Sequence, residues 1–287
     1  EAANRADVVI AVVGGSSARD FKTTYKETGA AIADKSQISD MECGEGFDRA
    51  TLSLLGKQLE LLESLKSTRK PLIVVYIEGR PLNKNWAAEH ADALLTAYYP
   101  GQEGGDAIAD VLFGDYNPAG RLPVSVPRSE GQIPVYYNKK APKCHDYVEM
   151  SASPLYSFGY GLSYTSYEYS NFKVNRTTFN ADDELIFEVD VKNVGERAGK
   201  ETVLLYSSDL AASVSPDVIR LRNFEKVELQ SGETKKVVMK LKGSDLAFVG
   251  QDRKWRLEQG RFRMKCGSEI LYIDCEKDKI WDTPNID

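Results

Sequence analysis

The feature of this sequence that most constrains its fold is a change in hydrophobic period about halfway along the chain. The first half contains runs of consecutive apolar residues at Val8–Val13 and Leu72–Ile77, and a third strand is expected at Ala93–Tyr98. Such runs are typical of strands that are buried on both faces, and segments of helical spacing separate them. Strands that alternate with helices pair in parallel. We therefore predict an α/β fold with a mostly parallel sheet for this half.

Three helices are expected between and after these strands. Leucines recur at helical spacing across Leu52–Ser67, which predicts an amphipathic helix that packs on the sheet. A second helix is expected through Trp86–His90 and a third from Gly101 to about Leu112. The stretch Ser16–Glu42 lacks clear periodicity. It predicts a long loop at the carboxyl edge of the first strand, where ligands bind in open α/β sheets.

The second half changes to a period of two. Leu185, Phe187, Val189 and Val191 alternate with more polar neighbours. Further short segments continue the pattern, at 203–206, 235–241, 261–266 and 270–275. Several short strands with polar turns and no helix indicate an antiparallel β-sandwich. The chain is therefore expected to be α/β followed by all-β.

A shift in composition separates the two halves. Pro, Gly, Ser and Tyr become frequent between Tyr116 and Thr165, which indicates a connector that wraps over the first domain. We expect a first domain at 1–135, a connector at 136–163 and a sandwich domain at 164–287.

Charge and apolar run length exclude two classes of partner. The net charge is −6 and no basic stripe is present, which argues against nucleic acid and against an anionic membrane surface. The longest apolar runs are far shorter than the ~20 residues that a membrane-spanning helix needs.

The cysteines and histidines do not form a metal motif. The four cysteines show no Cys-x-x-Cys spacing and the chain has 2 histidines, so we expect no metal and no cofactor. Cys266 and Cys275 are expected on the two arms of one hairpin, with Cys266 paired near Ile270. Because a disulfide needs Cα atoms within ~7 Å, both are expected to be free thiols.

Glu45 is the candidate catalytic group. It lies between two glycines in the run Gly44-Glu45-Gly46-Phe47-Asp48-Arg49. Glycines allow positive φ and close approach to a ligand, and a carboxyl aimed into an apolar sugar pocket can serve as a general acid. Glu42 is a competing candidate that lacks the flanking glycines. A solvated turn glutamate is the structural alternative.

Other motifs favour structural roles. The segments Gly101–Gly105 and Gly14–Ser17 suggest phosphate loops, but the spacing of known nucleotide motifs is absent, so the first is interpreted as a helix start. Four aromatic residues could stack on a sugar ring, although packing in the core or at a domain interface is favoured; they are Trp86, Tyr98, Tyr99 and Tyr137.

Four segments together resemble the C-terminal portion of glycoside hydrolase family 3, the β-glucosidase and β-xylosidase family. Their order and spacing match that family along nearly the whole chain; the segments are 6–15, 44–49 with the residues behind it to Gln58, 99–123 and 154–165.

The resemblance implies a fold and a missing partner. It implies that the first domain is the second part of an αβα sandwich and that the second is a fibronectin III-like β-sandwich. Family members usually begin with a (β/α)₈ barrel that supplies the nucleophilic aspartate. This barrel would then be a missing N-terminal domain of the same parent, and the 287 residues alone should be inactive.

The resemblance also implies a function. The parent would be an exo-acting retaining β-glycosidase, periplasmic or secreted, that hydrolyses terminal non-reducing sugars of an oligosaccharide or glycoside substrate. Glu45 would be its acid/base, and Asp48 and Arg49 would form an ion pair or loop clamp near the site. The alternative is a non-catalytic carbohydrate-binding or domain-interaction fragment. A homodimer is also possible, because loss of the barrel would expose an apolar sheet edge.

Overall fold

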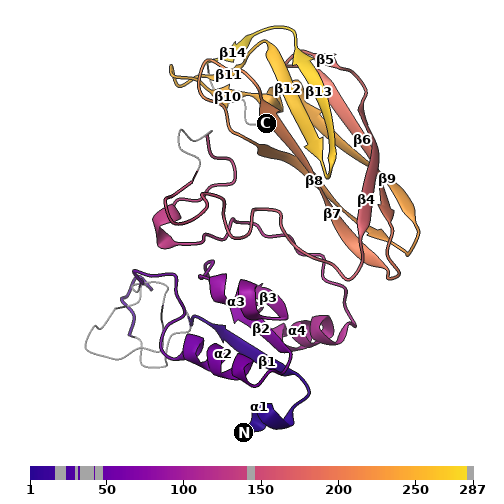
Figure 1. Cartoon of the computed structure of the whole chain (residues 1–287). Coiled ribbons are helices and arrows are strands. Elements are labelled where there is room, and N and C mark those ends of the chain that lie inside the picture. Colours follow the sequence, from indigo (N-terminus) through magenta and orange to yellow (C-terminus); the bar gives the residue numbers. More distant parts are fainter. Residues whose placement is uncertain (17–23, 30–31, 33–41, 43–47, 141–145, 283–287) are drawn as a thin grey trace. The chain divides into compact units, whose positions relative to one another are not determined.

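The computed structural model describes residues 1–16, 24–29, 32, 42, 48–140 and 146–282 (Figure 1). The chain divides into two compact units. The first comprises Glu1–Phe113, Ser125–Val135 and Ser153–Tyr156, and the second comprises the rest. The segment between the two regular regions therefore contributes to both units.

The first unit is built on a parallel three-stranded sheet, as the apolar runs predict. Its order is β1-β2-β3, and both neighbouring pairs are parallel. The elements of this unit are α1 (Ala2–Arg5), β1 (Val9–Gly14), α2 (Gln58–Ser67), β2 (Leu72–Ile77), α3 (Asn85–His90), β3 (Ala93–Tyr98), α4 (Gly104–Phe113) and the 3-10 helix η1 (Glu130–Gln132). Its core joins one face of β1 to β2, α2 and α3.

The prediction that the first strand is buried on both faces is wrong. Ala11 and Val13 are buried, but Val8, Ile10 and Val12 are 47%, 45% and 60% exposed. In the described part of the chain β1 lies at the edge of the sheet, and the described helices leave this face uncovered. The central strand β2, in contrast, is mostly buried. The expected homodimer stays a prediction.

Helix α2 begins six residues later than the leucine spacing predicts. Gly56 has a φ of +63°, which interrupts the helical backbone before Gln58. The Gln58 side chain then bonds to the end of β1: Gly14 N donates to Gln58 Oε1 at 2.8 Å, and Gln58 Nε2 donates to Gly14 O at 3.0 Å. Likewise α4 begins at Gly104, because Gly101 has a φ of +81°.

The second unit is a β-sandwich, and its strands are mostly antiparallel. One sheet has the order β4-β6-β9, a second β5-β13-β12-β7-β8, and a small third sheet β10-β11-β14. Its elements are β4 (Tyr167–Val174), β5 (Thr178–Phe179), β6 (Glu184–Asn193), β7 (Gly199–Asp209), β8 (Arg220–Leu229), β9 (Thr234–Lys242), η2 (Gly243–Leu246), β10 (Phe248–Val249), β11 (Trp255–Leu257), β12 (Gly260–Cys266), β13 (Glu269–Cys275) and β14 (Lys279–Trp281).

The sandwich core confirms the period-two pattern. The alternating residues Leu185, Phe187, Val189 and Val191 of β6 are all fully buried and face the buried side chains of β7, β12 and β13. Burial of this kind on one side of each strand is what holds two sheets together.

Cys266 and Cys275 are both free, as predicted. The hairpin pairs Cys266 with Glu269 and Cys275 with Gly260, so the thiols lie at opposite ends of the ladder. Burial, aided by the charge of Glu201, raises the pKa of the Cys266 thiol to about 12. Cys43 and Cys144 lie outside the described residues.

A buried ion pair attaches the segment after α4 to the sandwich. Arg121 Nη2 lies 2.6 Å from Glu201 Oε2 on β7, and Tyr169 Oη donates to Glu201 Oε1 at 2.8 Å. Both partners of the ion pair are nearly buried, with side chains 13% and 9% exposed. Burial and the neighbouring Glu201 raise the pKa of the Tyr169 hydroxyl, so it remains a donor to this carboxylate.

Replacement of this arginine should destabilise the second unit. Arg121→Met leaves the buried Glu201 carboxylate without its cation, and we expect a loss of about 2–4 kcal/mol, or roughly 5–15 °C in the midpoint of thermal unfolding. The double variant Arg121→Met/Glu201→Gln should recover part of that loss, since the introduced amide is neutral and still accepts from Tyr169. Calorimetry measures the unfolding midpoint, with Lys226→Met at an exposed position of β8 as the control. A single variant as stable as the parent contradicts it.

Candidate active site at the carboxyl edge of the parallel sheet

The parallel pairing brings the carboxyl ends of β1, β2 and β3 to one edge of the sheet. The chain is very close-packed there: a Cβ on Gly14 would lie 1.8 Å from Ile77 O, and one on Gly79 would lie 2.6 Å from the Tyr99 ring. Gly15 N donates to Ile77 O at 3.0 Å. The glycines after β1 therefore serve this close approach rather than a phosphate loop.

The run around Glu45 starts and ends at this edge. Glu45 itself, with 43–47, lies outside the described residues. Glu42, just before it, donates its N–H to Ser16 O at 2.8 Å, and Ser16 follows β1 by two residues. Glu42 Oε2 also lies 3.4 Å from Arg49 Nη1, so an ion pair joins the residues on the two sides of the segment.

Arg49 is the more buried partner of this pair. Its side chain is only 4% exposed, and it also donates to the carbonyl of Ser53. One planar guanidinium can hold a carboxylate and a carbonyl in fixed geometry. Among the described residues the Arg49 guanidinium thus pairs with Glu42 and not with Asp48, and the expected role of Asp48 and Arg49 as a clamp near the site stays a prediction.

Asp48 is held by a different arginine. Its Oδ1 accepts from Arg49 N at 2.8 Å and from Arg80 Nη1 at 2.7 Å. The backbone hydrogen bond from Arg49, followed by the bond and charge of Arg80, lowers the pKa of this exposed carboxyl. Asp48 is therefore ionised near neutral pH and unsuited to donate a proton.

A buried ion pair follows β2 and was not anticipated from the sequence. Lys84 Nζ lies 2.6 and 2.7 Å from the two carboxylate oxygens of Glu78, and both side chains are 1% exposed. Glu78 Oε2 also accepts from Leu82 N at 2.9 Å. Burial lowers the pKa of Lys84, while the charge and hydrogen bond of Glu78 act in the opposite direction. The Lys84 ammonium also lies 4.5 Å from the centre of the Tyr76 ring. The one sequence feature that could have indicated this pair is the charged residue Glu78 directly after a buried strand.

Two further contacts connect the segment after Arg49 to the unit. Asn83 N donates to Leu52 O at 2.7 Å. Glu130 Oε1 accepts from Thr51 Oγ1 and from Leu52 N, both at 2.7 Å, and these hydrogen bonds lower the pKa of Glu130. The residues that follow the glutamate run are thus fixed to the β2–α3 turn and to η1.

The candidate aromatic residues separate into two groups. Trp86 packs against the core and lies 4.8 Å from the His90 ring, while Tyr137 stacks on Phe158 at 4.2 Å. These two contribute to packing, as favoured from the sequence. Tyr98 and Tyr99 lie at the carboxyl edge of β3, and Tyr99 is 45% exposed.

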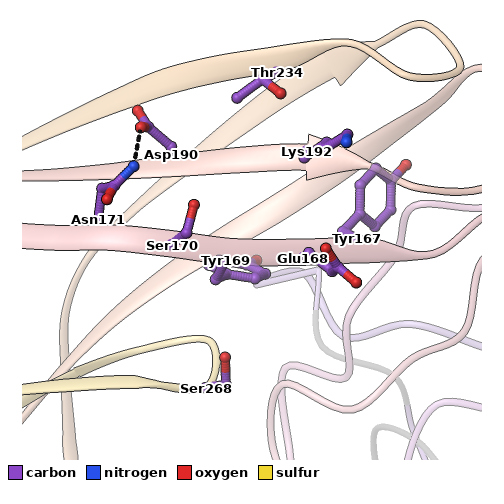
Figure 2. A pocket seen from close by; sticks show the side chains of 9 residues that line it. All are labelled: Tyr167, Glu168, Tyr169, Ser170, Asn171, Asp190, Lys192, Thr234 and Ser268. Carbon is purple, nitrogen blue, oxygen red and sulfur yellow. Dashed lines mark hydrogen bonds between the residues drawn. The ribbon is translucent and has the colours of Figure 1, made fainter.

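A polar depression on the second unit is a poorer candidate. Figure 2 shows it over β4 and β6, with a volume of about 340 Å³. Asn171 and Asp190 point toward each other there, and Asn171 Nδ2 donates to Asp190 Oδ2 at 2.8 Å. Its other lining carboxylate, Glu168, is exposed. A general acid with a raised pKa needs an apolar setting, which these lining residues do not provide.

No cluster of three His, Cys, Asp or Glu side chains within the described ranges could hold a metal ion. Across the same ranges, no helix has the length and apolarity that crossing a membrane requires.

Family models match both parts of the chain. Residues 1–164 match the glycosyl hydrolase family 3 C-terminal domain, and residues 201–270 match a fibronectin type III-like domain. The two matches correspond to the α/β region with its connector and to the middle of the β-sandwich.

Curated relatives carry β-glycosidase names. The periplasmic beta-glucosidase of Salmonella typhimurium is 38% identical over 95% of this chain and 34% of that protein. A beta-xylosidase of Formosa agariphila is 41% identical over 80% of this chain and 32% of that protein. A lysosomal beta glucosidase of Dictyostelium discoideum is 37% identical over 77% of this chain and 28% of that protein. The chain spans about a third of the length of these relatives.

Solved structures show the same fold. A β-glucosidase of Erythrobacter marinus matches with a TM-score of 0.83 and 37% identity, over 96% of this chain and 35% of that chain. The β-glucosidase of Listeria innocua in complex with glucose matches with a TM-score of 0.80 and 31% identity, over 94% of this chain and 36% of that chain. A mutant of the latter was solved in complex with laminaribiose.

Proposed function

Because the chain belongs to glycoside hydrolase family 3, we propose that it is the C-terminal portion of an exo-acting, retaining β-glycosidase, a β-glucosidase or a β-xylosidase. The names of the relatives support the reaction, and the glucose and laminaribiose complexes of the Listeria enzyme support a glycoside substrate. The coverage of about a third of each relative supports a longer parent that supplies the nucleophile. Periplasm and lysosome, the compartments named for two relatives, support export of that parent.

The observation that carries the assignment of Glu45 is the pairing of its two neighbouring carboxylates. Glu42 is joined to buried Arg49, and Asp48 is joined to Arg80. Each of these carboxylates is engaged by an arginine, and at Asp48 this engagement lowers the pKa, whereas a general acid must be protonated. Glu45 is the remaining carboxylate of the run. The two ion pairs and the hydrogen bond of Glu42 to Ser16 would hold both ends of its loop at the carboxyl edge of the sheet.

In this proposal Glu45 acts twice. It first donates a proton to the glycosidic oxygen as the nucleophile of the parent attacks the anomeric carbon. Its carboxylate then removes a proton from the water that hydrolyses the glycosyl-enzyme. Retaining enzymes perform this sequence with two carboxyl groups about 5–5.5 Å apart. Glu45 belongs to one wall of the site, and the nucleophile would come from the remainder of the parent.

The test compares the parent with the 287-residue chain. The parent should hydrolyse aryl β-glucosides or β-xylosides and release the β-anomer first, as detected by proton NMR. The isolated chain should show no turnover, since it lacks the second carboxylate of the pair. Turnover by the isolated chain, or release of the α-anomer by the parent, contradicts the proposal. Sugar binding by a parent without hydrolysis would favour a non-catalytic role.

The Arg49 clamp gives a second prediction for the parent. Arg49→Gln removes the charge that holds Glu42, and a shift of about 1 Å in a catalytic group costs on the order of 10²-fold in rate. We expect kcat to fall by about that factor on substrates with poor leaving groups, with KM changed much less. Arg49→Lys should restore part of the loss, because the charge remains while the fork is absent.

The control for this prediction is Arg69→Gln, which removes an exposed arginine of the same unit. Steady-state kinetics on a phenyl glycoside and a dinitrophenyl glycoside distinguish a positioning role from general damage. Equal losses of kcat/KM on the two substrates would overturn the clamp assignment, as would a change confined to KM.

A further inference from the structure

One cavity of the β-sandwich unit is lined by both aromatic and cationic side chains. Its volume is about 620 Å³, within the range of small-molecule sites. Its lining residues come from β11 and β14 of the small sheet, from the start of β8, from the end of β9 and from the 3-10 helix η2, with Ala181, Asp182 and Ala247. All of its lining residues belong to the second unit, so its composition does not depend on the candidate active site.

Two tryptophans form one part of the wall. Trp255 of β11 and Trp281 of β14 are directly opposite each other in an antiparallel ladder. Opposed residues of such a pair project from the same face of the sheet, with Cβ atoms about 4.5–5.5 Å apart. Both side chains line the cavity and are half-buried. They present adjoining indole surface, and an aromatic surface of this kind can bury the apolar face of a pyranose ring.

Three cations form another part of the wall. Arg220 and Arg222 lie at the start of β8, where its ladder with β7 shifts register, and Lys242 ends β9; all three line the cavity. Arg222 is fixed in place: its Nε donates to Ser207 Oγ at 2.7 Å, and its Nη1 donates to Asp245 O at 2.5 Å. Burial, followed by repulsion from Arg220, lowers the pKa of Arg222 to about 10, so it is still charged at pH 7.

Within the lining the cations outnumber the carboxylates by one. Asp182 and Asp245 are the lining carboxylates, against three cations. Asp245 Oδ2 already accepts from Lys242 N at 2.7 Å. Asp217 lies 3.8 Å from Arg220, but it is not part of the lining. The cavity thus combines indole surface, excess positive charge and one carboxylate, Asp182, that can accept from a hydroxyl group.

We propose that this cavity binds a sugar that carries a carboxylate, a hexuronic acid, with the ring against Trp255 and Trp281 and the carboxylate toward Arg220 and Arg222. Planar guanidinium groups recognise carboxylates through paired hydrogen bonds. A sugar without the carboxylate would make no charged contact with Arg220 and Arg222, and a carboxylate without the ring would not contact the two indoles. This proposal holds or fails independently of the proposed glycosidase reaction.

The test uses the 15N-labelled 287-residue chain and the indole N–H signals of its 3 tryptophans. Sodium D-glucuronate is the probe, D-glucose tests the ring alone, and acetate tests the carboxylate alone. Glucuronate should shift the signals of Trp255 and Trp281 saturably, while Trp86 in the first unit stays in place. Glucose and acetate should bind at least about fivefold more weakly, because each supplies half of the contacts. The absence of any saturable shift, or equal binding of either control, overturns the proposal.

Two variants locate the site. Arg220→Gln alters a side chain that is 41% exposed, so the fold should tolerate it, and it should weaken glucuronate binding by about fivefold or more. Trp281→Leu should weaken binding by a similar factor, with Trp255 as the reporter. Lys226→Gln, on the same strand but outside the cavity, should leave the affinity unchanged. If both cavity variants bind glucuronate as the parent does, the site lies elsewhere and the assignment is wrong.

Discussion

Replacement of Glu45 by alanine in the full-length parent should slow the hydrolysis of aryl β-glycosides with poor leaving groups by about 10²–10⁴-fold, the usual contribution of a general acid. Phenoxide is a poor leaving group that needs a proton as the bond breaks. Dinitrophenoxide departs without one, so its glycoside should lose far less in the glycosylation step. The dependence of rate on the leaving-group pKa should therefore become much steeper in the Glu45→Ala variant than in the parent.

The measurement is kcat/KM across a series of aryl glycosides for the parent and the variant. Glu63→Ala on the exposed side of α2 is the matched control and should leave the series unchanged. If Glu45→Ala leaves the hydrolysis of natural disaccharides within a few-fold of the parent, Glu45 is not the acid/base and Glu42 becomes the candidate to test.

Replacement of Lys84 by methionine should have the largest effect on stability. Glu78 would remain buried beneath the carboxyl edge without its cation, and removal of one partner from a buried pair costs about 3–5 kcal/mol. The double variant Glu78→Gln/Lys84→Met should recover much of this loss, because the introduced amide is neutral and can still accept from Leu82 N.

Amide hydrogen exchange in β2 is the direct measure, since β2 is central to the sheet and precedes the pair. Protection at Val74–Tyr76 should fall in Lys84→Met and return in the double variant, while protection in β6 of the second unit stays unchanged. Lys57→Met, which removes an 84% exposed lysine from a surface pair, should change little. A double variant that is less stable than Lys84→Met would contradict this account of the pair.

The strongest sequence patterns identified the regular parts of both units. Leu72–Ile77 is apolar at every position and became the central parallel strand, and the alternation across Leu185–Val191 became the buried face of β6. In both segments the arrangement of apolar residues along the sequence matches the burial of the side chains in the folded unit. The free thiols of Cys266 and Cys275 followed from hairpin register alone.

Two of the strands that the sequence pattern did not predict, β4 and β8, lie at sheet edges. An edge strand packs fewer side chains into the core, so its apolar alternation is weak: β8 is buried only at Leu229. In β4 the register shifts between Ser170 and Lys173, and Asn171 has a φ of +55°, which interrupts the period. A local sequence pattern does not reveal a strand whose pairing partners lie far away in the sequence.

Long-range polar contacts account for the remaining differences at the candidate site. Nothing within six residues of Gln58 shows that its side chain will bond to Gly14 at the end of β1. The Glu78–Lys84 pair and the Asp48–Arg80 pair likewise depend on turns that only the folded sheet creates. The sequence could therefore identify the chemical residue types of the site, but not which cation holds which carboxylate.

The assignment of Glu45 as the acid/base of a retaining β-glycosidase is tested most directly by azide rescue of Glu45→Ala in the parent. Azide needs no general base, so it should attack the accumulated glycosyl-enzyme from the face that water normally uses. The account predicts that azide accelerates turnover of a dinitrophenyl β-glycoside and that proton NMR identifies the product as the β-glycosyl azide. No acceleration, or formation of the α-glycosyl azide, would contradict it.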